Sequence, residues 1–413
     1  MTSVCPVYGK KIAFVACGYP LDVSTMLINS IALLSEHNRL DIIVSPFDSR
    51  CTLCPDWMQA LFVYVSRGSR GFVYRCLRKF CRIVARFLFP KSSIFAWRLK
   101  NFDLIMFSRW FGQHAENVRY DMVIAAECHA LIAVAPAVTP SCELLYYNME
   151  LLDWSEEHPL YEDKIPLKKL EHRALNSVAR VVITSHKRAH VFSEINNYPL
   201  ENIFVLPVVP RKVAFTARTS FFRDMFAIAE DKVIVIYSGN FMPWAQCLEI
   251  IESMVAWPEE AVLVMHTWNE QALHSEYFRR MQATAQGRPV YFSSRYLPYS
   301  DLAHTLSSAD VGLLYYEAID ANFTEIMFSS NKFGEYMAAG LPIICSPFPS
   351  LTEFVEKHNI GRAVSVENIG YALCDIIARL ETHRTNVSKC RDAYFNFDRY
   401  FMETFSQGTV QRH

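Results

Sequence analysis

Lys332 and Glu335 place a cationic and an acidic side chain close together in the sequence. They lie three residues apart, so on a helix both would face one side of the opening turn. Ser330 can cap that helix, and Gly340 followed by Pro342 would end it. The first turn of a helix offers free amides and the positive end of the helix dipole. This stretch therefore predicts an anion site at the start of a short helix.

A lysine and a glutamate near a helix start are most often a solvated ion pair, so the neighbouring sequence has to decide. Residues 307–316 have the pattern of a helix end followed by an apolar strand. About a dozen residues then separate this strand from the Lys332 helix, more than packing requires. Loops at the carboxyl ends of strands form the ligand crevice of open α/β sheets. The spacing favours a ligand site, with the ion pair as the alternative.

The run SSADVGLLYY, followed later by SSNKFGEYMAAGLPIICS, resembles the donor-nucleotide segment of GT-B glycosyltransferases, especially the retaining family 4 group. That group carries ADV-x-L-x-P, a polar loop and K-x-x-E-Y-M-A-x-G-x-P-V-I. The resemblance implies that Glu335 binds the ribose hydroxyls of the donor nucleotide and that Lys332 lies near its diphosphate. Many members carry a second glutamate at the position of Met327, which leaves Glu325 as the substitute to consider for holding the sugar.

Strand and helix patterns alternate along the chain, which predicts an α/β protein, and 413 residues suit two or three domains. The resemblance implies GT-B architecture, in which two Rossmann-like parallel-sheet domains face each other across a cleft. We expect an acceptor domain over 1–210 and a donor domain over 211–390. A C-terminal helix over 391–413 is expected to pack back on the first domain.

Further donor-side residues follow two predicted strands of the second domain. Gly239 and Asn240 come directly after an apolar strand and precede a helix, the order of a phosphate cradle, although one glycine is weak evidence. The resemblance implies that Gly239 lies against the diphosphate and that Arg295 and Tyr296 lie near the base. The basic pair that members often carry after this glycine is absent, so Arg295 is expected to help bind the diphosphate. Core packing of the Tyr296 ring is an equal alternative to stacking on the base.

Acceptor-side hypotheses rest on Glu127, His129 and Glu150, which follow two predicted strands of the first domain. In α/β enzymes, catalytic and ligand-binding side chains lie at the carboxyl ends of strands. An isolated histidine or glutamate there is nevertheless more often structural. The resemblance implies that the loop containing Glu150 borders the acceptor side of the sugar.

Residues 57–102 contain ten basic side chains and no acidic one. Within this segment, five basic residues recur at helical spacing among apolar ones: Arg75, Arg78, Lys79, Arg82 and Arg86. A basic amphipathic helix suits the surface of an anionic membrane. A core helix with a solvated basic rim is the alternative, and RNA binding is a weaker one because no nucleic-acid motif accompanies the segment.

The composition limits the cellular locations and the classes of binding partner that we expect. A net charge of −1 argues against general affinity for nucleic acid. No apolar run is long enough to span a bilayer, and the apolar start over 12–17 is too short for a secretory signal. The twelve cysteines lack framework spacing, and Cys51 with Cys54 is a lone CxxC that favours a surface turn over zinc or redox chemistry. We expect a cytoplasmic protein, peripheral on the inner face of the membrane.

These features predict transfer of a sugar from a UDP- or GDP-sugar to a hydroxyl of a glycan or lipid-linked acceptor, in cell-surface polysaccharide or glycolipid synthesis. Retention at the sugar carbon is implied by the resemblance alone. A lysine and helix-end amides can stabilise the leaving diphosphate, so neither a metal nor a tightly bound cofactor is expected. A nucleotide-sugar epimerase and a glycan- or lipid-binding protein with reduced catalysis are the alternatives.

Overall fold

The computed structural model describes residues 7–17, 21, 24–44, 62–63, 80–81, 83–84, 93–155, 164–211, 218–295 and 297–406. The chain forms two compact units: the first comprises Met1–Pro207 with Arg399–His413, and the second comprises Val208–Asp398. The polypeptide therefore passes between units after Pro207 and again after Asp398. The first passage lies three residues before the division at 210 expected from the sequence, and the second lies within the last helix, α18 (Phe397–Ser406).

The first unit is built on a parallel sheet of seven strands in the order β3-β2-β1-β4-β5-β6-β7. The strands are β1 (Lys11–Ala16), β2 (Arg39–Val44), β3 (Phe62–Val63), β4 (Met122–Ala126), β5 (Glu143–Asn148), β6 (Arg180–Ile183) and β7 (Ile203–Val205). Its main helices are α1 (Thr25–His37), α4 (Ile94–Lys100), α5 (Phe102–Val118), α6 (Glu127–Val134), α7 (Lys164–Ala174) and α8 (His186–Asn196). All five residues of β4 are apolar and buried, as expected where helices cover both faces of a parallel sheet.

The second unit is built on a parallel sheet of six strands in the order β10-β9-β8-β11-β12-β13. The strands are β8 (Val233–Ser238), β9 (Ala261–His266), β10 (Val290–Ser293), β11 (Val311–Leu314), β12 (Ile343–Cys345) and β13 (Gly361–Ala363). Its helices are α9 (Phe221–Phe226), α10 (Cys247–Ser253), α11 (Glu276–Thr284), α12 (Tyr299–Leu306), α13 (Ala321–Thr324), α14 (Asn331–Ala338), α15 (Pro349–Lys357), α16 (Ile369–Ala378) and α17 (Leu380–Tyr394).

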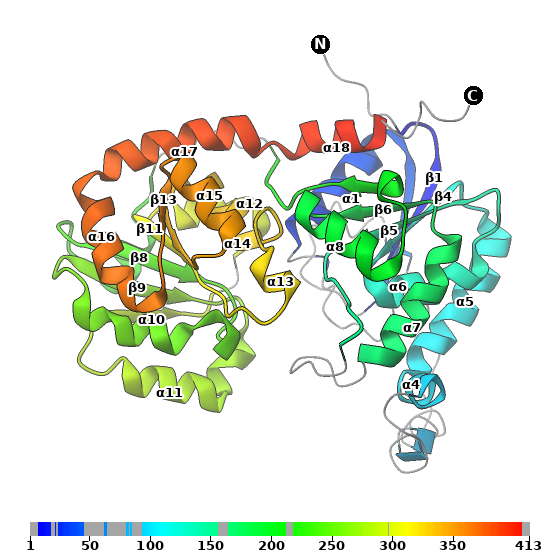
Figure 1. Cartoon of the computed structure of the whole chain (residues 1–413), viewed down its shortest axis with the longest axis horizontal. Coiled ribbons are helices and arrows are strands. Elements are labelled where there is room, and N and C mark those ends of the chain that lie inside the picture. Colours follow the sequence, from blue (N-terminus) through cyan, green and yellow to red (C-terminus); the bar gives the residue numbers. More distant parts are fainter. Residues whose placement is uncertain are drawn as a thin grey trace. The chain divides into compact units, whose positions relative to one another are not determined.

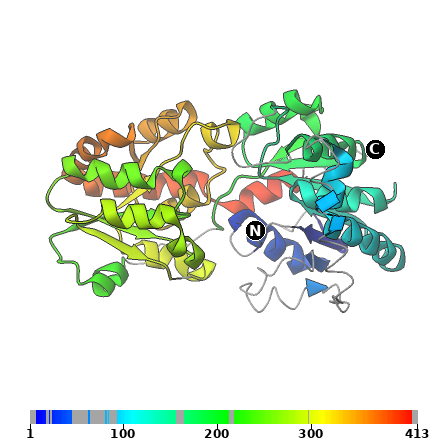
Figure 2. The same ribbon diagram turned by 90° about the horizontal axis from the view of Figure 1, so that it is seen from below.

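Helices cover both faces of the second sheet. Side chains of α10, α11 and α16 share one buried core with β8, β9 and β11, and α12 contacts α14 on the other face (Figure 1). Seen from below, α10 and α11 lie in front of this sheet (Figure 2). The strand order reverses between β8 and β11, so the second unit has its topological switch point there, at the position where open α/β sheets bind ligands.

Both units therefore have the alternating, doubly wound parallel architecture expected from the sequence, and the prediction of an α/β fold with two Rossmann-like domains is confirmed. Within the part of the chain that the structure describes, no helix is both long enough and apolar enough to cross a membrane.

Candidate functional site

Helix α14 begins and ends as its sequence predicts. The Ser330 hydroxyl accepts a hydrogen bond from the Phe333 amide at 3.3 Å, which caps the first turn. Gly340 has φ +76°, the left-handed conformation in which glycine commonly ends helices. Between these two residues the helix carries Lys332 and Glu335 beside the switch point of the second sheet.

Lys332 is buried between two tyrosine rings. Only 8% of the residue is exposed, and its Nζ lies 4.4 Å from the ring centroids of both Tyr237 and Tyr316. Its one hydrogen bond within the described chain goes to the Tyr237 hydroxyl at 3.4 Å, a long contact. An ammonium has three N–H donors, so two of them have no acceptor there. Burial lowers the pKa of Lys332 to about 8.

Glu335 is partly buried on the same helix and does not pair with Lys332. No ion pair or hydrogen bond joins the two side chains across the described residues, although the Lys332 charge partly offsets the effect of burial on the carboxyl. Burial raises the pKa of Glu335 to about 7. The solvated ion pair that the sequence left open is therefore wrong, because the ammonium is held over aromatic rings and the carboxylate keeps its lone pairs for another partner.

The loop after β8 passes directly beside the Lys332 side chain. A Cβ on Gly239 would lie 3.2 Å from Lys332 Cδ and 3.2 Å from the Tyr237 hydroxyl, so only glycine lets the backbone come this close without displacing them. The Gly239 amide donates to the His266 carbonyl at 2.9 Å. The Tyr237 hydroxyl donates to the Asn240 carbonyl at 2.7 Å. The structure thus brings together Lys332, Gly239 and Asn240.

Of the remaining donor-side residues expected from the sequence, Arg295 does not join this group. The Arg295 side chain is exposed, and its guanidinium lies 5.8 Å from the centre of the Phe221 ring. No contact links it to Lys332 within the described chain. Tyr296 lies outside the described residues.

Sequence reasoning missed the aromatic surroundings of the site. Tyr237 and Tyr316 stand at the carboxyl ends of the neighbouring strands β8 and β11. The Tyr316 hydroxyl is hydrogen-bonded to the Ser330 hydroxyl at 2.8 Å, and its ring lies parallel to Trp244, with centroids 6.1 Å apart. The signal available in the sequence was a polar aromatic residue at each of these strand ends, where working groups are expected.

The acceptor-side residues of the first unit are only partly brought together. Glu127 is buried at the junction of β4 and α6 with φ +71°, and its carboxyl accepts the Met149 amide at 2.8 Å. Burial and, secondarily, the Glu150 charge raise the pKa of Glu127 well above its usual value. His129 instead lies against Trp97, with ring centroids 6.1 Å apart, and burial lowers its pKa.

Several predictions lie outside the described residues. They concern the proposed membrane-binding residues Arg75, Arg78, Lys79, Arg82 and Arg86 and the CxxC residues Cys51 and Cys54. In the remainder of the chain, no group of three or more histidine, cysteine, aspartate or glutamate residues is arranged to hold a metal ion.

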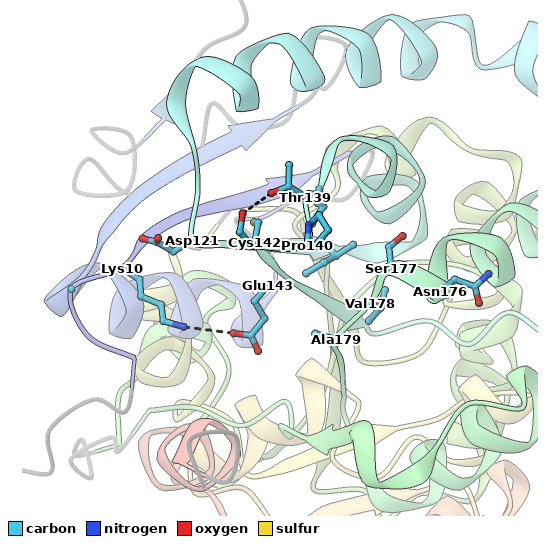
Figure 3. Close-up of a pocket in the computed structure, with 14 residues that line it drawn as sticks. Lys10, Asp121, Thr139, Pro140, Cys142, Glu143, Asn176, Ser177, Val178 and Ala179 are labelled. Atoms are coloured by element: carbon cyan, nitrogen blue, oxygen red, sulfur yellow. Dashed lines mark hydrogen bonds and ion pairs between the residues drawn. The ribbon is translucent and has the colours of Figure 1, made fainter. Parts of the chain in front are cut away.

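A cavity of about 700 Å³ lies at the edge of the first sheet where the strands begin, away from the carboxyl ends that carry Glu127 and Glu150 (Figure 3). Lys10 and Glu143 form an ion pair of 3.6 Å in its wall, and Asp121 and Ala179 precede β4 and β6 there. None of the predicted site residues lines it, and open α/β sheets bind their ligands at the other end of the strands.

Comparison with known proteins defines the fold. Neither a protein-family model nor a curated protein sequence matches the chain. Solved structures match over nearly its whole length. Sucrose-phosphate synthase from Thermosynechococcus elongatus is 16% identical with a TM-score of 0.67, covering 97% of this chain and 98% of that one. HepE from Anabaena, in complex with UDP-glucose, is 16% identical with a TM-score of 0.67, covering 98% and 100%.

A glycosyltransferase from Rickettsia africae is 10% identical with a TM-score of 0.60, covering 98% of this chain and 100% of that chain. Likenesses of this extent show that the chain has the GT-B fold, as the resemblance implied. At such identities they define the architecture and leave the activity to be argued from the site.

Proposed function

We propose that this protein is a glycosyltransferase that moves a sugar from a nucleotide-sugar donor to a hydroxyl acceptor. The observation that carries the proposal is the buried Lys332 ammonium, which lies beside Gly239 at the switch point and has two N–H donors without an acceptor in the described chain. An ammonium buried in this way is costly unless an anion completes its surroundings, and the diphosphate of a nucleotide sugar is such an anion.

In this mechanism Lys332 binds the diphosphate that leaves the sugar. Negative charge develops on the leaving oxygens in the transition state, and a fixed ammonium in a site shielded from water stabilises that charge strongly. Gly239 lets the backbone approach the phosphates closely. The Glu335 carboxylate accepts hydrogen bonds from the ribose hydroxyls. Glu127, His129 and Glu150 are the acceptor-side residues of the proposal.

The donor we propose to test first is a UDP-sugar, because HepE, which shares the fold, was captured with UDP-glucose; GDP-sugars are the second choice. We propose a hexosyl transfer with retention, in which a glycan or lipid-linked molecule supplies the hydroxyl, in cell-surface polysaccharide or glycolipid synthesis. These finer assignments rest on the sequence resemblance to family 4 enzymes.

Calorimetric titration with UDP tests the donor site. Wild-type protein should bind UDP, and Lys332→Met should weaken binding by about 100-fold, as expected for a buried charge-assisted contact worth about 3 kcal/mol. Lys357→Met, an exposed lysine at the end of α15, is the matched control and should bind like wild type. Equal UDP affinity in both variants would contradict the assignment.

Product analysis separates the proposed activity from its rivals. An epimerase would convert the nucleotide sugar without any acceptor, and a binding protein would leave it unchanged. A glycosyltransferase should release nucleoside diphosphate in proportion to added acceptor, and anomeric analysis of the product reports retention or inversion.

We further propose that the protein is cytoplasmic and binds the inner face of the membrane through the basic residues of 67–100. The support is the sequence of that segment, which carries basic and apolar side chains without an acidic one. The protein should sediment with vesicles containing anionic lipid at low salt and remain in solution with neutral vesicles. Equal recovery from both kinds of vesicle would count against this location.

A further inference from the structure

The two strands that flank the switch point separate before their ends. β8 pairs with β11 at only two positions, Val235 with Val311 and Ile236 with Gly312. On its other side β8 stays paired with β9 as far as Ser238, and β11 stays paired with β12 as far as Leu314. The ladder between β8 and β11 is therefore open at its carboxyl end, while both neighbouring ladders remain closed.

The Tyr336 hydroxyl occupies this opening. It accepts a hydrogen bond from the Ser238 amide at 2.9 Å. As a donor, its oxygen lies 3.2 Å from the Leu313 carbonyl oxygen and 3.4 Å from the Ile236 carbonyl oxygen. These are backbone groups of the two separated strands. Tyr336 is completely buried, so the Ser238 amide and the Leu313 carbonyl would each lose this partner if the hydroxyl were absent and the strands stayed apart.

Gly312 provides the space for the Tyr336 ring. A Cβ at this position would lie 2.6 Å from Tyr336 Cδ2, closer than two carbon atoms that are not bonded to each other can approach. Glycine in the middle of a central strand weakens the strand and often marks a close approach by another group. Here the group that approaches is the tyrosine ring, so Gly312 and Tyr336 form one complementary pair.

This pair bears directly on the proposed donor site. Tyr336 follows Lys332 by four residues on α14, so both side chains leave the same face of the helix. Lys332 reaches Tyr237 and Tyr316 at the ends of the two strands, and Tyr336 enters between the strands one turn further on. Ser238, which the hydroxyl holds, immediately precedes Gly239.

We propose that Tyr336 is a positioning residue: its hydroxyl holds β8 and β11 apart and thereby sets the spacing between the Gly239 backbone and the Lys332 ammonium for a diphosphate. The inference rests on the proposed function, because it concerns how the same site binds a nucleoside diphosphate. Without the hydroxyl, Ser238 and Leu313 must find other partners, and the loop beside Lys332 must move with them.

The test compares Tyr336→Phe with Tyr315→Phe. Tyr315 is an equally buried tyrosine after β11, whose hydroxyl donates to the Val364 carbonyl at 3.0 Å, so this variant also removes one buried hydroxyl from the second unit. We expect both variants to fold with similar losses of stability. Tyr336→Phe should weaken UDP binding by about tenfold, the size of a 1.4 kcal/mol effect, and Tyr315→Phe by less than about twofold. Wild-type UDP affinity in Tyr336→Phe, or the same loss in both variants, would overturn the proposal.

A second measurement needs no nucleotide. The ammonium of Lys332 can be titrated by NMR in isotope-labelled, ligand-free protein. Movement of the loop should admit water to the ammonium, so the pKa of Lys332 should rise by about 0.5 or more in Tyr336→Phe and stay at its wild-type value in Tyr315→Phe. An unchanged pKa in Tyr336→Phe would contradict the positioning role.

The two measurements also separate the two ideas. If wild-type protein binds neither UDP nor GDP, the proposed function fails, and the titration of Lys332 still decides whether Tyr336 positions it. If wild-type protein binds UDP and neither variant differs from it in UDP affinity or in the Lys332 pKa, the proposed function stands and the positioning role is refuted.

Discussion

Lys168 in the first unit and Lys332 in the second are both buried near aromatic rings, but they differ in the hydrogen-bond acceptors available to them. Lys168 on α7 is completely buried and forms an ion pair of 2.7 Å with Glu171. It also donates to the Asn196 side chain at 2.6 Å. Lys332 on α14 is nearly as buried, but its nearest neighbours are two aromatic rings, and its one hydrogen bond within the described residues measures 3.4 Å.

The difference supports a structural role for Lys168 and the ligand-binding role proposed for Lys332. Lys168 joins α7 to α8 through Asn196, and its ion-pair partner on α7, Glu171, accepts a hydrogen bond from the Tyr146 hydroxyl at 2.7 Å. Among the described residues, Lys332 forms no ion pair or hydrogen bond of comparable strength. The lowering of its pKa from 10.5 to about 8 corresponds to about 3 kcal/mol of unfavourable free energy for the charged form. A cost of that kind is common at functional sites, where a ligand removes it.

The largest effect is expected at the structural lysine. Lys168→Met would leave the buried Glu171 carboxylate without its cation, so the free energy of unfolding should fall by about 3–5 kcal/mol. Urea denaturation followed by circular dichroism measures this change. Lys169→Met, at the exposed neighbouring position, is the matched control and should stay within about 0.5 kcal/mol of wild type. A small loss at position 168 would mean that the two lysines do not differ as described.

Substitution of Lys332 is expected to change the free energy of unfolding in the opposite direction. Because the folded protein at pH 7 carries an ammonium that it stabilises poorly, Lys332→Met should raise the stability of the ligand-free protein by up to about 3 kcal/mol. The unfolded chain keeps its lysine protonated up to about pH 10.4, whereas the folded chain releases the proton from about pH 8. Wild-type stability should therefore rise with pH between these values, and the advantage of the variant should vanish above them. Destabilisation at pH 7 in urea titrations would contradict this explanation.

Donor binding should have a pH optimum between the pKa of Glu335, about 7, and the pKa of Lys332, about 8. Above about pH 8 Lys332 loses its proton, so UDP affinity should fall by up to about tenfold for each pH unit. Below about pH 7 Glu335 gains a proton and loses part of its capacity to accept hydroxyl hydrogen bonds, so affinity should fall there as well. Calorimetry at pH 8 in buffers of different ionisation enthalpy should detect proton uptake by Lys332. A flat profile from pH 6 to pH 9 would rule out both roles.

The smallest effect concerns the ribose contact. Glu335→Gln should weaken UDP binding by about 1–2 kcal/mol, because an amide accepts hydrogen bonds less strongly than a carboxylate. The same substitution should hardly affect 2′,3′-dideoxy UDP, which lacks the hydroxyls. Glu353→Gln, at an exposed position on α15, serves as the control. An equal loss for both nucleotides would place Glu335 away from the ribose.

Much of the architecture could be predicted from local sequence patterns. The cap at Ser330, the stop at Gly340 and the apolar strands β4 and β8 follow from hydrogen bonding and hydrophobic periodicity within a few residues. The same reasoning placed Lys332, Gly239 and Asn240 at one edge of a parallel sheet, where the structure brings them together. The family resemblance placed Arg295 in that group as well, and the structure instead leaves this side chain exposed against Phe221.

Local sequence patterns are enough to predict that Lys332 and Glu335 share one helix and that this helix follows a strand of a parallel sheet, because these relations depend on neighbours along the chain. The position of the lysine between Tyr237 and Tyr316, and the entry of Tyr336 into the space beside Gly312, follow instead from the folding of distant segments against one another. Tyr336 lies 98 residues along the chain from its hydrogen-bond partner Ser238. The protonation and spacing of the site depend on burial among such distant partners, which no local pattern encodes.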